Sequence, residues 1–386
     1  MMLAQHFSRW RAANPDRLHF AAHSHHPWPD ATQAAHARYW EDSAALADRK
    51  WERIFGEVIP AAQDHVARKL SLSDPRQVAF APNTHEFVLR LYSCFESTRP
   101  VRVLATAHEF HSFSRQTRRL QEAGRVELTA IPLEPWETFD ARFARAAREG
   151  PWDLVWLSHV FFDSGFVVRD LEGICDSAPA DAMVAIDGYH AFCALPVDLS
   201  RIHRRAFYLA GGYKYAMSGE GACFLAVPPG NRLRPVDTGW YASFDRLADA
   251  RQEVPYADDA FRFWGATFDA SGLYRFIAAM DWLDQVRITI EDIHRHATRL
   301  QKHFVDACAR RGVAPLAAAN LVPPAGAPRG NFLAFALPDA EEVHRRITAQ
   351  QVTIDRRGDR LRFGFGLYHD EAQVDLLVER IERALR

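Results

Sequence analysis

The sequence predicts an α/β protein with a mainly parallel, doubly wound sheet and a smaller α+β domain at the C-terminal end. From about residue 71 to residue 230, short β-rich runs alternate with helical stretches, a pattern typical of parallel strands connected by helices. Beyond residue 270, long helices come first and shorter strands and helices follow. The 386 residues, 48% of them hydrophobic and 25% charged, are enough for two or three domains.

The first helical region covers residues 29–70, where the apolar positions have helical spacing, and we predict two helices broken near Lys50 and Pro60. The predicted strands of the sheet then follow in the order QVAF, VRVLAT, VELTAI, DLVWLS, MVAID, AFYLA and CFLAV. In a sheet of this kind, ligands bind beyond the carboxyl ends of the strands. Residues just after each run are therefore the first candidates for a site.

The last third of the chain has a different pattern. An irregular aromatic stretch follows Pro235, and long helices are predicted over residues 272–311. The tail contains NFLAFAL, a helix over 340–350, VTIDRR, LRFGFG and a final helix. This alternation predicts a compact α+β unit.

Composition excludes several classes of function. A formal net charge of -2 and a pI near 6.8 lack the basic surplus of a nucleic-acid-binding protein. No run of eighteen apolar residues predicts a membrane span, and the first residues lack the order of a signal peptide, so we expect a cytoplasmic protein. Five scattered cysteines favour free thiols over disulfides or a zinc site.

Lys214 is unusual in a chain that prefers arginine. Of the 47 basic residues only four are lysines, and Lys50, Lys69 and Lys302 lie among charged residues in helical-looking segments. Lys214 instead follows the apolar run AFYLAGG and is flanked by glycines. Desolvation at a strand end lowers the pKa of an amine, and only a neutral amine attacks an aldehyde. An arginine cannot replace the lysine in this reaction, because its guanidinium stays protonated. We predict that Lys214 forms an imine; the alternative is a surface lysine in a glycine-rich loop.

Asp187 stands at the end of another predicted strand, in VAIDGYHAF, and His190 follows three positions later. A carboxylate beside a pyridine nitrogen keeps that nitrogen protonated, so the ring can accept electrons. Lys214 and Asp187 together therefore predict pyridoxal 5'-phosphate (PLP) as the cofactor. Alternatively, Asp187 caps a turn and His190 is a structural, half-buried histidine.

A phosphate group requires backbone donors and a hydroxyl at the start of a helix. The segment FAPNTHEFVLRL provides Asn83, Thr84 and His85 between a strand and a helix, although these residues would also serve as an ordinary helix cap. The glycines of GGYKYAMSGEG do not have the order of a nucleotide P-loop. We therefore predict that residues 83–85 bind the cofactor phosphate.

The segment TAHEFHSFSRQ follows a strand and offers Phe110 or His111 as a flat group to stack on the pyridine ring. Its histidines lack the HExxH order of a metalloprotease. The histidines of HSHHP, near residue 25, have no carboxylate or cysteine at a diagnostic spacing. We therefore expect no metal ion.

These residues resemble the fold-type I PLP enzymes, and within them the class V aminotransferase family, nearest to kynureninase. The likeness extends from about residue 18 to the end and is strongest in SHVFFDSG, AIDGYHAF, YKYAMSGEGACFLAV, GWYASF and LRFGFGLYHD. It implies three parts. Residues 1–30 contribute to the active site and the small domain, residues 31–270 form the PLP-binding domain, and residues 271–386 form the small domain.

The resemblance also implies roles for single residues. Lys214 is the Schiff-base lysine, Tyr213 beside it helps to bind the phosphate, and Trp240 and Thr267 close the same site. In this family some phosphate contacts come from the partner subunit, which implies a homodimer with shared active sites.

Arg362 matches the residue that binds the α-carboxylate of the substrate in the family, by a two-pronged guanidinium contact. In LRFGFGLYHD, Arg362 and Gly364 should share one face of a strand. Without the family, a surface arginine would be the preferred interpretation. If Arg362 is structural, then Arg356 or Arg357 in the preceding strand becomes the better candidate.

Three departures from the family separate possible reactions. Kynureninases have an aspartate where this chain has Phe113, and their Gly-Asn-Ser-Leu-Gly turn is replaced by AHSHHP. The strand reading FFDSG lacks the asparagine that class V aminotransferases and desulfurases often place there. No cysteine stands where a desulfurase would present its sulfur acceptor.

We therefore expect a PLP enzyme that acts on a small α-amino acid by transamination. The alternative is a kynureninase-like hydrolase that cleaves a carbon–carbon bond. That reaction also needs an aryl pocket and an activated water, for which Trp264, His108 and the N-terminal histidines are candidates. A non-catalytic or metal-binding module is disfavoured because Lys214 and Asp187 are both present.

Overall fold

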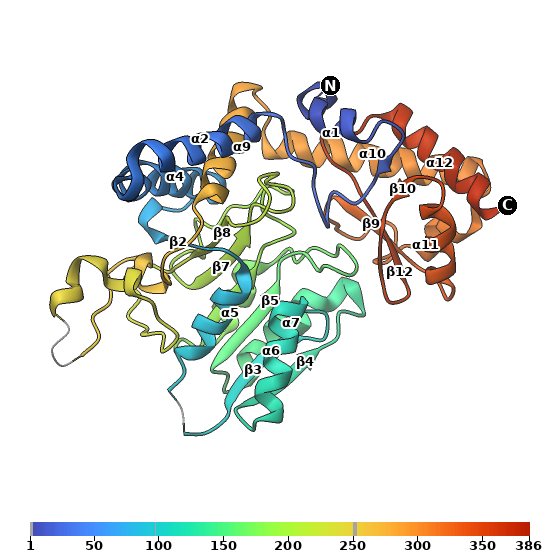
Figure 1. Ribbon diagram of the computed structural model, residues 1–386. Helices are drawn as coiled ribbons and strands as arrows, with labels where there is room; N and C mark the ends of the chain where they lie inside the picture. Colours follow the sequence, from blue (N-terminus) through green and yellow to red (C-terminus); the bar gives the residue numbers. More distant parts are fainter. Residues whose placement is uncertain (1–2, 97, 250–252) are drawn as a thin grey trace.

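The computed structural model describes residues 3–96, 98–249 and 253–386. Its main sheet contains β2 (Val78–Ala81), β3 (Val101–Thr106), β4 (Val126–Ile131), β5 (Leu154–Ser158), β6 (Met183–Asp187), β7 (Ala206–Gly211) and β8 (Cys223–Ala226). The strand order is β2-β8-β7-β6-β5-β3-β4, and only β8 runs antiparallel to its neighbours (Figure 1). The predicted mainly parallel, doubly wound sheet is confirmed.

The central strands are buried along their whole length. All residues of β2, β5, β7 and β8 are buried, as expected for a sheet covered on both faces. The helices that connect successive strands are α5 (Thr84–Ser93), α6 (His111–Glu122), α7 (Phe139–Glu149) and α8 (Leu171–Ser177). Because β5, β6 and β7 are parallel neighbours, their carboxyl ends meet at one edge of the sheet.

The N-terminal helical region differs from the prediction in one respect. After the short α1 (Ser8–Ala13), the chain forms α2 (Ala31–Leu46), α3 (Lys50–Arg53), a π-helical turn (Ile54–Val58) and α4 (Ile59–Leu70). The break near Lys50 is present, since Ala47 has a positive φ of 50°. The predicted break at Pro60 is wrong. Pro60 is the second residue of α4 and directly follows the π-helical turn, which joins α3 to α4 without interruption.

The smaller part combines one antiparallel and one parallel sheet. Strands β9 (Phe332–Ala336), β12 (Arg360–Gly364) and β11 (Asp355–Arg357) form the antiparallel sheet, and β1 (Leu18–His19) pairs in parallel with β10 (Val352–Thr353). The predicted strand VTIDRR is therefore divided between two sheets. Helices α10 (Ile290–Arg310), α11 (Ala340–Thr348) and α12 (Glu371–Leu385) complete this part.

Two hydrophobic cores can be distinguished, and α10 links them. Ile290 and Ile293 belong to the core around the main sheet, together with α9 (Ser271–Gln285), whereas Phe304 belongs to the core around β9 and β12. Phe20 of the N-terminal segment packs in this second core, and Figure 1 shows that segment, in blue, beside the red C-terminal elements. The predicted domain limits at residues 30 and 270 stay predictions.

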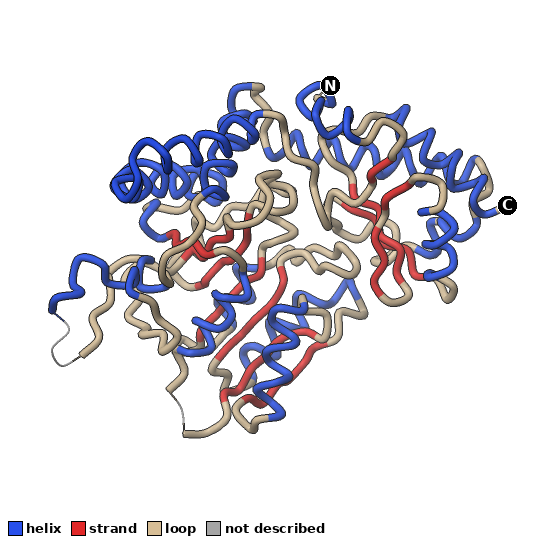
Figure 2. Tube along the Cα trace, viewed as in Figure 1, coloured by secondary structure: helices blue, strands red, loops and turns tan. Residues whose placement is uncertain are grey.

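Loops fill the region between the two parts. Figure 2 draws them in tan between the carboxyl ends of the main sheet and the antiparallel sheet. Among the described residues, no helix is long and apolar enough to cross a membrane. The carboxyl edge of the main sheet is thus the place to look for a site.

Candidate active site

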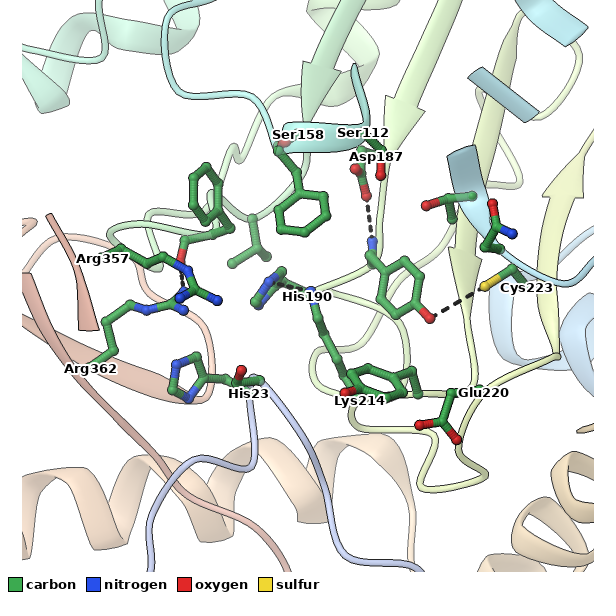
Figure 3. Close-up of a pocket in the computed structure, with 18 of the residues that line it drawn as sticks. His23, Ser112, Ser158, Asp187, His190, Lys214, Glu220, Cys223, Arg357 and Arg362 are labelled. Carbon is green, nitrogen blue, oxygen red and sulfur yellow. Dashed lines mark hydrogen bonds between the residues drawn. The ribbon is translucent and has the colours of Figure 1, made fainter. Parts of the chain in front are cut away.

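A cavity of about 400 Å³ opens at the carboxyl ends of the central strands (Figure 3). Ser158 and Asp187, the last residues of β5 and β6, face it side by side because they are partners in the sheet register. The N-terminal segment adds His23, and the antiparallel sheet adds Arg362. This volume lies in the range of small-molecule sites.

Lys214 projects into the cavity from the loop after β7 and is 9% exposed. Its Nζ atom lies 2.5 Å from Nε2 of His190. Burial lowers the pKa of Lys214 to about 7, although the charge of Asp187 opposes this shift. A substantial share of the amine is therefore neutral near pH 7, as attack on an aldehyde requires.

Asp187 is half-buried at the end of β6 and lines the cavity. One carboxylate oxygen accepts a hydrogen bond of 2.9 Å from the backbone N–H of Tyr189. Burial raises the pKa of Asp187, while the Tyr189 N–H and Lys214 act in the opposite direction. A cation in the cavity would favour the ionised form, and a protonated pyridine nitrogen is such a cation.

Two aromatic rings stand beside the lysine. The Lys214 Nζ lies 5.3 Å from the ring centre of Phe110 and 4.7 Å from that of Tyr189. His111 is exposed and is not among the residues that line the cavity, so the geometry favours Phe110 as the stacking ring. Tyr189 lies within the motif AIDGYHAF, but its local pattern predicted no role for it.

The start of α5 also reaches the cavity. Asn83 and Thr84 line it, and the Asn83 side chain accepts a hydrogen bond of 3.1 Å from the backbone N–H of Glu86. Asn83 is thus both a helix cap and a cavity residue. The side chain of His85, predicted to bind phosphate, is exposed and does not line the cavity. His85 follows Thr84 on another face of the helix, and its contact with the phosphate stays a prediction.

Tyr213 also lines the cavity beside Lys214, and its hydroxyl lies 2.7 Å from Nδ1 of His25. Trp240 and Thr267, expected to close the same site, instead line a second cavity of about 710 Å³ that contains Phe55. Within one chain they do not reach the Lys214 cavity.

Arg362 is buried, which excludes the surface role considered for it. Its Nη2 pairs with Oδ2 of Asp355, and its Nη1 donates to the carbonyl oxygen of Phe162. The other Asp355 oxygen lies 3.2 Å from Arg357, which also lines the cavity. Arg356 does not line it. Arg362 thus holds a positive charge at the end of the cavity nearest the antiparallel sheet.

The residues present fit PLP. Burial lowers the pKa of His190 well below its usual value, so its ring is neutral, and its Nδ1 atom is buried without a hydrogen-bond partner among the described residues. The lysine amine, a carboxylate and an aromatic ring line the same cavity as His190. In PLP, the aldehyde would meet the lysine amine, the pyridine nitrogen would meet the carboxylate, and the ring face would meet the aromatic side chain.

None of the five cysteines, all of which lie in the described ranges, is exposed. Burial raises the pKa of each thiol to about 12, including that of Cys223, which lines the cavity. Such thiols are poor nucleophiles. The described residues also contain no group of three metal-ligating side chains.

The fold and this site define a fold-type I PLP-dependent enzyme. The model of the family "Aminotransferase class-V" matches residues 21–322, most of the chain, and the chain therefore belongs to that family. The model of the kynureninase C-terminal domain matches residues 293–381. The predicted family and cofactor are confirmed.

Relatives of known sequence differ in their reactions. Isopenicillin N epimerase of Streptomyces clavuligerus is 29% identical over 185 residues, 46% of this chain and 46% of the epimerase. A cysteine desulfurase of Pectobacterium atrosepticum is 22% identical over 250 residues, 64% of this chain and 60% of the desulfurase. The chain thus matches less than two thirds of either relative.

Solved structures are similar over nearly the whole chain. The apo structure of a cysteine desulfurase from Thermococcus onnurineus has a TM-score of 0.78 and 16% identity, covering 96% of this chain and 94% of the desulfurase. A complex of the cystine C-S lyase C-DES has a TM-score of 0.80 and 16% identity, covering 96% and 98%. At this identity the likeness establishes the fold.

Proposed function

We propose that this enzyme transfers the amino group of a small α-amino acid, with Lys214 as the acid and base. The observation that supports this proposal most is the buried Lys214 amine, with a pKa near 7, in one cavity with Asp187, His190 and Arg362. Transamination requires the fewest further groups. The proton transfers of this reaction can be performed by a single, correctly placed amine, and water takes part in releasing the 2-oxo acid.

When bound, PLP supplies an electron sink for the electrons of the bond broken at the substrate Cα. Asp187 would hold the proton on the pyridine nitrogen. The Nζ of Lys214, once released, would take the proton from Cα and deliver it to the cofactor carbon. Arg362 would hold the α-carboxylate, so that the bond to be broken is oriented relative to the ring.

The cysteines argue against desulfuration, the activity named for two of the matched relatives. A thiol that accepts sulfur must be accessible and readily ionised. All five thiols in this chain are at least half-buried, and their pKa values are raised to about 12.

The test mixes the purified holoenzyme with a panel of L-amino acids, each with and without a 2-oxo acid. We expect at least one amino acid to give its own 2-oxo acid and to convert the visible absorption to that of the amine form of the cofactor. Release of sulfide or alanine from cysteine, with no transfer to any 2-oxo acid, would contradict transamination.

A kynureninase-like hydrolase is the second candidate, and the match to the kynureninase C-terminal domain over residues 293–381 favours it. Two residues considered for that reaction lie elsewhere. Trp264 is buried in a stack with Phe261, and His108 is held by Asp163 at 2.6 Å. Adding kynurenine to the same panel decides between the reactions, because hydrolysis would release anthranilate without any amino acceptor.

We also propose a homodimer in which Trp240 and Thr267 of one subunit approach the cofactor phosphate of the other. Trp240 is 43% exposed and Phe244 is 47% exposed, both beside the second cavity. Exposed aromatic side chains of this kind often mark subunit contacts. Mixing inactive Lys214→Ala subunits with Trp240→Ala subunits should restore activity above that of either variant alone, and no gain would contradict shared sites.

A further inference from the structure

His23 is buried in a way that leaves it without hydrogen bonds. Its side chain is 0% exposed, yet neither ring nitrogen has a hydrogen-bond partner among the described residues. The Asp355 Oδ2 atom lies 3.8 Å from its Nε2, beyond hydrogen-bonding distance. A buried polar group without a partner destabilises the fold, so its retention calls for a ligand that supplies the missing bond.

The surrounding residues hold the ring in one place. Its plane stacks on Phe332, with ring centres 4.5 Å apart and planes inclined by 19°. Behind it, a Cβ atom at Gly364 would overlap Nδ1 of His23 and come within 2.7 Å of its backbone nitrogen. Gly364 thus leaves room for the histidine, and Nε2 is the nitrogen nearer to Asp355.

His23 faces the same end of the cavity as Arg362 (Figure 3). The Nη atoms of Arg362 are used by Asp355 and by the Phe162 carbonyl, but its Nε is buried without a hydrogen-bond partner among the described residues. Burial and the charge of Arg362 lower the pKa of His23 well below its usual value. The neutral ring can therefore donate one N–H without adding a charge.

We propose that Nε2 of His23 and Nε of Arg362 together bind the α-carboxylate of the substrate. The two donors belong to residues that line the same cavity from separate parts of the chain, one from the N-terminal segment and one from β12. Each lacks another partner, and a carboxylate has two oxygens to accept both hydrogen bonds. This inference rests on the proposed function for the presence of an amino-acid substrate, but the carboxylate contact itself does not depend on the reaction type.

The test compares three probes of matched size: alanine, ethylamine and propionate. Binding to the holoenzyme is followed by the visible absorption of the cofactor for the two amines and by ligand-observed NMR for propionate. His23→Leu should weaken alanine and propionate by about tenfold or more and leave ethylamine unchanged, because a hydrogen bond to a charged group is lost. His23→Gln, which can place an N–H near the position of Nε2, should restore part of the affinity.

A control variant and a stability measurement distinguish a loss of carboxylate binding from a folding defect. His203→Leu removes another buried histidine, one that lies 3.2 Å from Gln77 and does not line the cavity, and should leave all three affinities unchanged. In the apo-protein, His23→Leu should raise or maintain the unfolding temperature, since it removes two unpaired buried nitrogens.

Three results would overturn the inference: parental affinity of His23→Leu for propionate, an equal loss for ethylamine, or a lower unfolding temperature of the apo variant. A further outcome separates the inference from the proposed function. If no amino acid of the panel changes the cofactor absorption of the parent enzyme or yields a 2-oxo acid, but propionate binding still depends on His23, the proposed function fails and the carboxylate site stands.

Discussion

The end of the cavity with Asp187 and Lys214, where we propose the cofactor binds (the cofactor end), is built from neighbouring strand ends. The end with His23 and Arg362, where we propose the carboxylate binds (the carboxylate end), is assembled from segments far apart in the chain. Asp187 and Lys214 follow β6 and β7, which are adjacent in the sheet. At the other end, His23 comes from the N-terminal segment, Phe162 from the loop after β5, and Arg362 from β12. The first end is fixed by one sheet. The second depends on how the two parts of the molecule are held together, so variants at the two ends should fail in different ways.

The largest effect is expected at the cofactor end. Lys214→Ala should lower the turnover rate by roughly 10²–10⁴ or more, since the group that moves the proton is lost. The variant should also fail to retain cofactor after borohydride treatment, which mass spectrometry of the intact protein detects. Parental turnover would remove Lys214 from the mechanism.

Asp187→Asn keeps a side-chain oxygen for the Tyr189 N–H but loses the negative charge. We expect turnover to fall by about 10²–10³, the size of effect seen when one preorganised electrostatic group is removed. The unfolding temperature of the apo-protein should fall little or rise, because desolvation raises the pKa of Asp187 and disfavours its charged form. Near-parental rates would reduce Asp187 to a turn residue.

At the carboxylate end, Arg362→Lys should act on binding rather than on turnover. The change retains the charge but loses the planar Nε–H and the paired Nη atoms that meet Asp355 and Phe162. The amino-acid concentration for half-maximal rate should rise by about tenfold, with cofactor colour unchanged. Ethylamine is the control, and an equal loss for it would show that the substitution has disturbed the cofactor end as well.

The smallest effect concerns the stability of the apo-protein. Burial lowers the pKa of Lys214 from 10.5 to about 7, so between these values the unfolded chain holds one more proton than the folded chain. The free-energy cost of burying the protonated Lys214 is therefore complete below about pH 7, and it declines as pH rises toward 10.5. Urea unfolding of the parent and of Lys214→Met at pH 6 and pH 9 measures this cost. The free energy of unfolding of the parent should lie below that of the variant at pH 6 and approach it at pH 9. A constant difference would contradict the lowered pKa.

The main sheet and much of the cofactor end could be predicted from the sequence, because both depend on local pattern. Strand ends are visible as apolar runs, so the amino-acid sequence alone was enough to place Asp187 and Lys214 at the site. Ser158 is an exception, since its place beside Asp187 follows from the register of β5 and β6, which no local pattern reveals.

The carboxylate end could not be predicted from local pattern. His23 is recognisable in the sequence only as part of a histidine-rich stretch, because its partners, Phe332 and Gly364, are distant in the chain. Arg362 is identified by family resemblance, and its contact with Asp355 depends on the register of β11 and β12. Trp240 is assigned to the cofactor by the same resemblance, through a contact that would come from the second subunit.

The pairing of β1 with β10 has a consequence for synthesis. Residues 18–20 leave the ribosome long before β9, β10 and β12, the strands against which they pack. Until those strands emerge, Leu18 and Phe20 have no core to enter, while the main sheet can already form. We therefore expect Leu18 and Phe20 to stay exposed until the C-terminal strands have been synthesised.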